Sequence, residues 1–299
     1  MPDAKISQSR EANGEISERV ATGETALIYK DIKATLQTPF INLIWRRLAV
    51  APGALAGVWR AVKPLYENGV VYQGAQHLSD QMVSDQTKSE RRTNMRTVPR
   101  VPLEWNDAEI AMETRYTIIA LLSAYERANL LNLVTFSAVL ERSDTSFSAS
   151  NGGAFGKAGA PALPSGLEPP TQTIPTQLHY VDLCREDAEL VQRFNAIAAS
   201  AKTERHHASL PLTLIRWPDV MALFIRYLEI CDADGGLRHD IERLQTSSVD
   251  VGRALGQSIS KIDLTDKETR HLRATLVPFM SDTLVRMLVI IRQLKIALD

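Results

Sequence analysis

The amino-acid sequence predicts an all-α protein built from two tandem helical repeats that face each other as a pseudo-twofold monomer. Apolar residues recur at three- and four-residue spacing along most of the chain, which is the spacing of one helix face. The period-two alternation of a β-strand is missing, because the one short β-branched run, residues 70–72, has no alternating neighbours. Proline and glycine gather in one segment between two helical halves.

Residues 1–23 are polar and lack hydrophobic periodicity, so we expect a mobile N-terminal tail there. From Glu24 onward the pattern becomes helical, because apolar residues recur on one face: Leu27, Ile28, Ile32 and Leu36. The same spacing predicts helices within the ranges 41–48, 55–62, 118–140, 190–201, 221–230 and 272–298.

The segment 142–178 interrupts the helical pattern. Because proline removes a backbone donor and glycine adds backbone freedom, we expect a long linker here. The linker separates repeat 1, residues 24–141, from repeat 2, residues 179–299. Its prolines and glycines are Pro161, Pro164, Pro169, Pro170, Pro175, Gly152, Gly153, Gly156, Gly159 and Gly166.

The two halves share landmarks at corresponding places. Pro52 and Pro218 each follow one apolar helical run and precede another. Residues 106–109 and 265–268 both fit a capping box, in which Asn106 or Thr265 caps the N3 amide and a glutamate reaches back to the N-cap amide. A true repeat predicts a small-molecule pocket between the copies. Chance similarity of two helical hairpins is the alternative.

Composition excludes several classes of function. The chain has 299 residues, 44% hydrophobic and 23% charged, with 34 basic and 35 acidic residues. A formal charge of -1 argues against nucleic acid as a partner, because such binding rests on a basic surface. The apolar stretches fall short of the roughly 20 residues that span a bilayer. The first residues lack the apolar core of a signal peptide, so we expect a cytoplasmic protein without a membrane segment.

Nothing in the sequence has the spacing of a metal or cofactor motif. Cys184 and Cys231 lack C-x-x-C spacing, and the adjacent His206 and His207 would point about 100° apart on a helix. Residues 152–159 are rich in glycine but follow no strand and lack the Gly-Lys-Ser/Thr ending of a phosphate loop. We therefore expect no metal and no cofactor.

The sequence from about residue 25 resembles the group I 2-haloacid dehalogenases, which accept both D- and L-haloacids. The resemblance is carried by residues 29–36, 38–40, 52–53, 59–60, 129–141, 208–209 and 217–218, in the order and spacing of that family. It implies an all-α monomer of two tandem repeats, a small organic acid as ligand, and no cofactor. The implied reaction is displacement of halide from the α-carbon by an activated water, without an ester intermediate.

The resemblance also implies which residues form the site. The asparagine that helps to hold the water falls on Asn129, and an aromatic wall of the substrate pocket falls on Phe40. The aspartate that acts as base in that family stands directly after an Ala-Ser pair. In this sequence the pair ends at Ser209, which the resemblance implies is a substrate-binding residue. The residue in that place is Leu210.

Leucine cannot accept a proton, and loss of a positioned general base costs about two to four orders of magnitude in rate. Glu204 and His207, a few residues upstream, are the substitutes that the sequence offers. Three alternatives stay open: a hydrolytic dehalogenase, a diverged protein that runs another displacement or only binds a small ligand, and a helical protein that associates with a partner chain. A homodimer is also left open.

Overall fold

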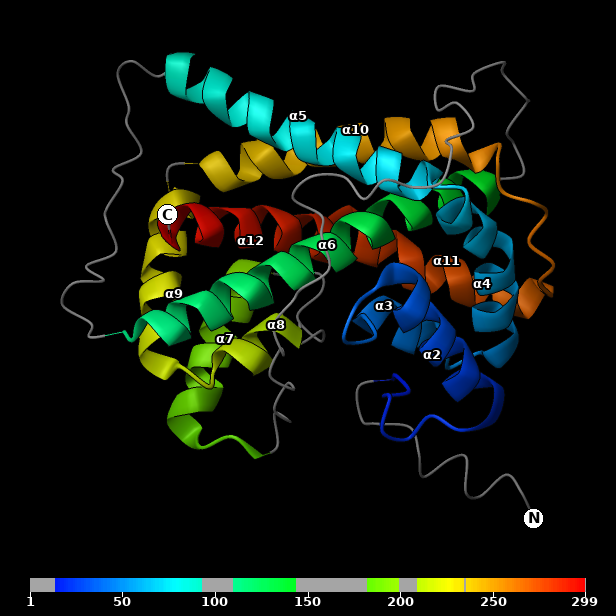
Figure 1. The fold of residues 1–299 in the computed structure, drawn as a ribbon, viewed down its shortest axis with the longest axis horizontal. Helices are drawn as coiled ribbons and strands as arrows, with labels where there is room; N and C mark the ends of the chain where they lie inside the picture. Colours follow the sequence, from blue (N-terminus) through cyan, green and yellow to red (C-terminus); the bar gives the residue numbers. More distant parts are fainter. Residues whose placement is uncertain (1–13, 93–109, 144–181, 199–208, 234, 299) are drawn as a thin grey trace. The chain divides into compact units, whose positions relative to one another are not determined.

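The computed structural model describes residues 14–92, 110–143, 182–198, 209–233 and 235–298. Within these residues every regular element is a helix, which confirms the predicted all-α class (Figure 1). The chain divides into two units. Unit 1 comprises Met1–Gln76, Leu131–Glu168 and Ser247–Ser281, and unit 2 comprises His77–Leu130, Pro169–Thr246 and Asp282–Asp299.

Unit 1 begins with three helices, α2 (Gly23–Leu36), α3 (Leu43–Leu48) and α4 (Pro52–Glu67). Helix α2 buries Tyr29, Ile32 and Leu36, whereas Leu27 is 69% exposed. The buried face is therefore rotated from the predicted one, because Tyr29 turns inward and its hydroxyl donates to the carbonyl of Ile16 at 2.7 Å.

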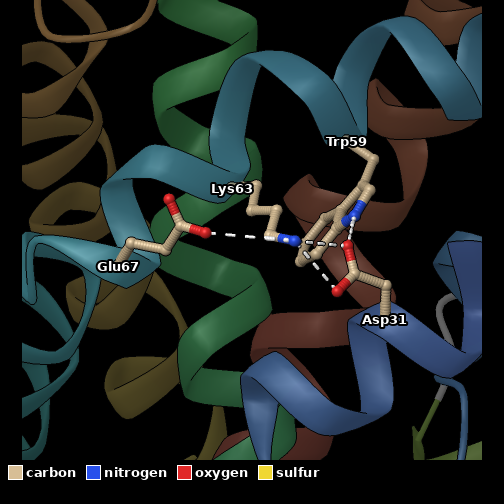
Figure 2. Close-up of polar contacts among 4 residues, drawn as sticks. All are labelled: Asp31, Trp59, Lys63 and Glu67. Atoms are coloured by element: carbon tan, nitrogen blue, oxygen red, sulfur yellow. Dashed lines mark hydrogen bonds and ion pairs between the residues drawn. The ribbon is translucent and has the colours of Figure 1, made fainter.

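Helix α4 starts at Pro52, whose fixed φ suits the first turn of a helix. Its apolar face packs on α2, and polar side chains join the two helices at the rim of this contact (Figure 2). Trp59 Nε1 donates to Asp31 of α2 at 2.8 Å, and Lys63 Nζ lies 2.8 Å from the same carboxylate. Glu67 lies 3.9 Å from Lys63 on its other side.

Residues 14–22 differ from the predicted mobile tail, because they pack on unit 1. The carboxylate of Glu15 lies 3.1 Å from the Arg46 guanidinium, and both side chains are buried. The amide of Ile16 donates to the carbonyl of Arg46 at 3.0 Å. The described N-terminal segment is therefore part of the unit 1 core.

Helix α11 (Asp266–Pro278) completes unit 1 and packs on α3 and α4. It begins with the predicted capping box: Glu268 N donates to Thr265 Oγ1 at 3.3 Å, and Thr265 N donates to Glu268 Oε2 at 2.8 Å. The corresponding capping box at Asn106 stays a prediction, and the next described helix begins at Met112. Residues 106–109 lie outside the described residues.

Three long helices contribute residues to each unit: α5 (Val70–Arg92), α6 (Met112–Ser143) and α10 (Gly236–Gly256). Helix α6 is buried on all sides over residues 124–139. In unit 1 it approaches α10 closely, since a Cβ built on Gly252 would lie 2.7 Å from Ser137 Cβ. Helix α6 ends at Ser143, and the rest of the predicted linker, 144–178, lies outside the described residues.

Unit 2 contains α7 (Arg185–Ala198), α8 (Ser209–Leu214), α9 (Pro218–Ala233) and α12 (Leu284–Leu298). A five-residue π-helix, η2 (Phe279–Thr283), stands between α11 and α12, where the sequence predicts one uninterrupted helix. It follows directly on Pro278, which has no N–H to donate and whose ring crowds the preceding turn.

Two series of helices have matched lengths. Helices α2, α3 and α4 have 14, 6 and 16 residues, and α7, α8 and α9 have 14, 6 and 16. Ile44 and Leu210 hold the second position of the six-residue helices, and proline starts the third helix in both series. These lengths agree with a tandem repeat, which stays a prediction.

The helical stretch Asp266–Leu298 is long and apolar enough to cross a membrane, contrary to the expectation that no segment is. However, 61% of its apolar window is buried inside the protein, as in a core helix.

Candidate functional site

Helix α8 of unit 2 places the residues that the resemblance assigns to substrate and base. Ser209 is its first residue and is half-buried, and Leu210 follows with only 1% of its surface exposed. The Thr213 hydroxyl donates a hydrogen bond to the Ser209 carbonyl at 3.3 Å. The helix ends shortly before Pro218, whose ring disfavours helical backbone at the residue before it. The position of the expected base thus holds a buried apolar side chain.

Asn129 lies on α6 in unit 2 and is buried, with 5% of its surface exposed. Tyr125 lies one helical turn earlier on the same face. The Tyr125 hydroxyl is 3.4 Å from Thr213 Oγ1, which brings this part of α6 next to α8. The structure therefore places Asn129 and Leu210 on two neighbouring helices of one unit.

A buried carboxylate, Glu126, lies three residues before Asn129. Its Oε2 is 2.6 Å from Lys295 Nζ, and its Oε1 is 3.7 Å from Arg292 Nη1, both on α12. Each carboxylate oxygen faces a cation, as a buried charge requires. Glu126 therefore has a structural partner for both oxygens.

One carboxyl group of unit 2 has an altered acidity. Burial raises the pKa of Asp240 on α10 above its ordinary value, against the smaller opposing effects of His239, Gln293 and Arg292. Asp240 interacts with Arg292, which also lies beside Glu126, but it is not among the residues that the resemblance assigns to the site.

Phe40, the predicted aromatic wall, belongs to unit 1 and is half-buried in the loop between α2 and α3. Thr38 Oγ1 donates to the Phe40 carbonyl at 3.1 Å. The next amide, of Ile41, donates to Glu18 Oε1 at 2.7 Å. The loop that carries Phe40 is therefore held on both sides of this residue.

The proposed substitutes for the base, Glu204 and His207, lie outside the described residues, as does His206. Within the part of the chain that the structure describes, no three His, Cys, Asp or Glu side chains gather as metal ligands.

Sequence reasoning missed a buried polar cluster in unit 1. Trp45 Nε1 of α3 donates to Asn132 Oδ1 of α6 at 2.8 Å, and the Tyr66 hydroxyl lies 2.6 Å from Thr135 Oγ1. Burial raises the pKa of Tyr66 above its ordinary value, so its phenol keeps its proton. The available signal was an amide, Asn132, between the apolar pairs at residues 130–131 and 133–134.

Comparison with known proteins places the fold. No protein-family model matches the chain, and no curated protein matches its sequence. A D-2-haloacid dehalogenase in complex with L-LA superposes with a TM-score of 0.77 at 14% identity, covering 95% of this chain and 96% of that one. This chain therefore has a haloacid dehalogenase-like fold.

Two further structures of this kind agree with the haloacid dehalogenase-like fold. A D-2-haloacid dehalogenase mutant in complex with D-2-CPA gives a TM-score of 0.72 at 16% identity, covering 93% of this chain and 94% of that one. Another D-2-haloacid dehalogenase mutant gives 0.72 at 15% identity, covering 95% of each chain. The likeness therefore extends over nearly the whole length of both proteins.

Proposed function

We propose that the protein binds a small organic acid on its haloacid dehalogenase-like fold, and that it lacks the base needed to hydrolyse a 2-haloacid. The observation that carries this proposal is Leu210, which is 1% exposed on α8 in the place where the resemblance expects an aspartate. The fold supports the class of ligand, and the apolar side chain argues against the family's reaction.

The chemistry explains why one side chain decides the outcome. When water attacks the α-carbon of a 2-haloacid, a C–O bond forms, the C–halogen bond breaks and halide leaves with the electron pair. A base must take a proton from the attacking water. The Asn129 amide can orient a water or a substrate oxygen, but it cannot take that proton at neutral pH.

Glu126, the carboxylate three residues before Asn129 on α6, has a structural role. Glu126 has Lys295 and Arg292 beside its two oxygens, and the remaining residues of α8 are Ser209, Pro211, Leu212, Thr213 and Leu214. Within the described residues of α8, no side chain therefore supplies a carboxylate. This is the physical basis for expecting a diverged protein rather than an active hydrolase.

The test is halide release from both enantiomers of 2-chloropropionate and 2-bromopropionate. We expect the wild-type protein to release halide at the background rate. Leu210→Asp restores a carboxylate at the second residue of α8, where burial raises its pKa toward a value suited to a base. We expect this variant to exceed the wild-type rate at least tenfold.

Two control variants separate a base from a general effect of charge. Leu210→Asn has a similar size but no proton-accepting carboxylate, and Leu212→Asp places a carboxylate at another buried position of α8. Both are expected to stay at background, with circular dichroism checking that the variants fold. Wild-type halide release that Leu210→Asp does not increase would contradict the proposal. Glu204→Gln and His207→Gln would then show which residue serves as base.

Binding of the acid is tested separately by titration calorimetry with 2-chloropropionate. Asn129→Ala removes the amide of the site, and we expect the dissociation constant to rise about tenfold, or roughly 1.4 kcal/mol. Ser123→Ala, elsewhere on α6 in unit 2, is the matched control and should bind as the wild type does. Unchanged binding in Asn129→Ala would remove Asn129 from the site.

A further inference from the structure

Residues 14–22, which precede α2 in unit 1, form a segment that we call the N-terminal strap. Its buried side chains are Glu15 and Ser17, with 5% and 7% of their surface exposed, and both are polar. Ile16 and the other apolar side chains of the strap are only half-buried. The strap therefore reaches into unit 1 through polar groups.

The first anchor of the strap is on α3 and α2. The Glu15 carboxylate lies 3.1 Å from the Arg46 guanidinium, and the Ile16 amide donates to the Arg46 carbonyl at 3.0 Å. The Ile16 carbonyl accepts from the Tyr29 hydroxyl at 2.7 Å. Both main-chain polar groups of Ile16 are thus bonded to helices of unit 1.

The second anchor is on the loop between α2 and α3, residues 37–42. Glu18 Oε1 accepts from the Ile41 amide at 2.7 Å, and Glu18 Oε2 pairs with Lys33 of α2. The acceptor of the Ile41 amide therefore belongs to the strap. When the strap leaves unit 1, this amide loses its partner and the loop loses a contact next to Phe40.

The contacts of the strap differ in kind from those that hold the helices. A hydrogen bond or ion pair adds little net free energy where water competes for its groups, and the Glu18 and Lys33 side chains are each 34% exposed. Helix α4, by contrast, packs apolar side chains such as Val58 with no exposed surface. Segments with few buried apolar contacts open at lower free energy than the core.

The two anchors are coupled through the backbone. Only Ser17 separates Ile16 from Glu18. The Ser17 carbonyl accepts from the Val20 amide at 3.2 Å, which closes a turn within the strap. A segment this short, with its own turn, can hold one anchor only weakly once the other is released.

We propose that the N-terminal strap is a latch on unit 1. It undocks as one unit while the helices stay folded, and undocking releases the loop 37–42. Phe40 lies in this loop, so the latch governs the mobility of the position in unit 1 that the resemblance assigns to a pocket wall. The latch needs no ligand, so it is independent of the proposed function.

The test is native-state hydrogen exchange of the full-length ¹⁵N-labelled protein, followed by NMR. We expect the Ile16 and Ile41 amides to have protection factors within about threefold of each other and about a hundredfold or more below that of Val58. Protection of both amides equal to that of Val58 would overturn the latch, because they would then open only when unit 1 unfolds. Protection factors that differ more than about tenfold between Ile16 and Ile41 would also overturn it, because the anchors would open separately.

Variants test the coupling between the anchors. Tyr29→Phe keeps the ring but loses the hydroxyl bonded to Ile16, and it should speed exchange about fivefold at Ile41 as well as at Ile16. Glu18→Ala removes the loop anchor and should speed exchange at Ile16 similarly. Each variant probes the latch from one anchor, so either one that folds decides it. Thr265→Ala, which weakens α11 elsewhere in unit 1, is the control and should leave both amides within about twofold of wild type. An effect confined to the anchor that was changed, or an equal effect of Thr265→Ala, would overturn the latch.

Discussion

At the scale of single residues, Asp31 illustrates how one carboxylate connects two helices of unit 1. It accepts hydrogen bonds from Lys63 and Trp59 of α4 (Figure 2). The hydrogen bond from Lys63 is the largest influence, and it lowers the pKa of Asp31 despite the opposing effect of burial. The ionised form of Asp31 is therefore favoured by folding.

This pKa shift predicts a pH-dependent contribution to stability. Because the pKa of Asp31 is lower in the folded than in the unfolded protein, its contribution is present above the unfolded value and is lost as pH falls through the folded one. Asp31→Asn should therefore unfold more easily than the wild type at pH 7, with the difference shrinking in strong acid. Urea denaturation at a series of pH values measures this.

The neighbouring Glu67 provides the control for Asp31. Its carboxylate is 60% exposed and lies 3.9 Å from Lys63, so the pair is well solvated. Glu67→Gln should change the free energy of unfolding very little at any pH. A difference between Asp31→Asn and wild type that stays constant from neutral to acidic pH would contradict the role given to ionised Asp31.

At the scale of elements, the start of α11 makes a quantitative prediction. Thr265→Ala removes the side-chain cap of the N3 amide and should lower the free energy of unfolding by about 1 kcal/mol. Thr265→Ser keeps the hydroxyl and should retain most of the stability. Chemical denaturation of the three proteins checks this, and equal stability of the alanine and serine variants would argue against the cap.

The crossing of α6 and α10 within unit 1 predicts a second effect on stability. A Cβ on Gly252 would lie 2.8 Å from the backbone carbonyl of Ser137, so Gly252→Ala must push the two helices apart. We expect a loss of about 1–3 kcal/mol, the usual cost of overpacking. Asp250→Ala, on the exposed side of α10, should stay within about 0.5 kcal/mol of wild type. A fully stable Gly252→Ala would show that the crossing is looser.

Most individual helices follow from apolar periodicity, and the exceptions have physical reasons. Helix α5 escapes prediction because polar residues dominate its sequence after the first turns. Helix α10 does carry a helical signal, since its buried Leu237, Ile241 and Leu244 recur at four- and three-residue spacing. The π-helix η2 could not be predicted, because apolar periodicity does not distinguish the wider turn after Pro278 from an ordinary α-helix. Residues 14–22 look like a tail because the groups that order them, such as Glu15 and Ile16, bond to partners distant in the sequence.

At the scale of the whole molecule, the fold is shared with D-2-haloacid dehalogenases at 14–16% identity. A fold of this kind constrains which helices meet, whereas chemistry depends on single side chains placed upon it. Asn129 and Leu210 could be picked out because a resemblance supplies their positions. The Trp45–Asn132 contact could not be predicted, because its partners are 87 positions apart in the sequence and no local pattern indicates that they meet.

The central claim is that a leucine in place of the base prevents hydrolysis. The most direct test compares halide release from 2-bromopropionate by the wild-type protein and by Leu210→Asp. We predict background release by the wild-type protein and a rate at least tenfold higher for Leu210→Asp. Equal release of halide by the two proteins, above background, would contradict the claim.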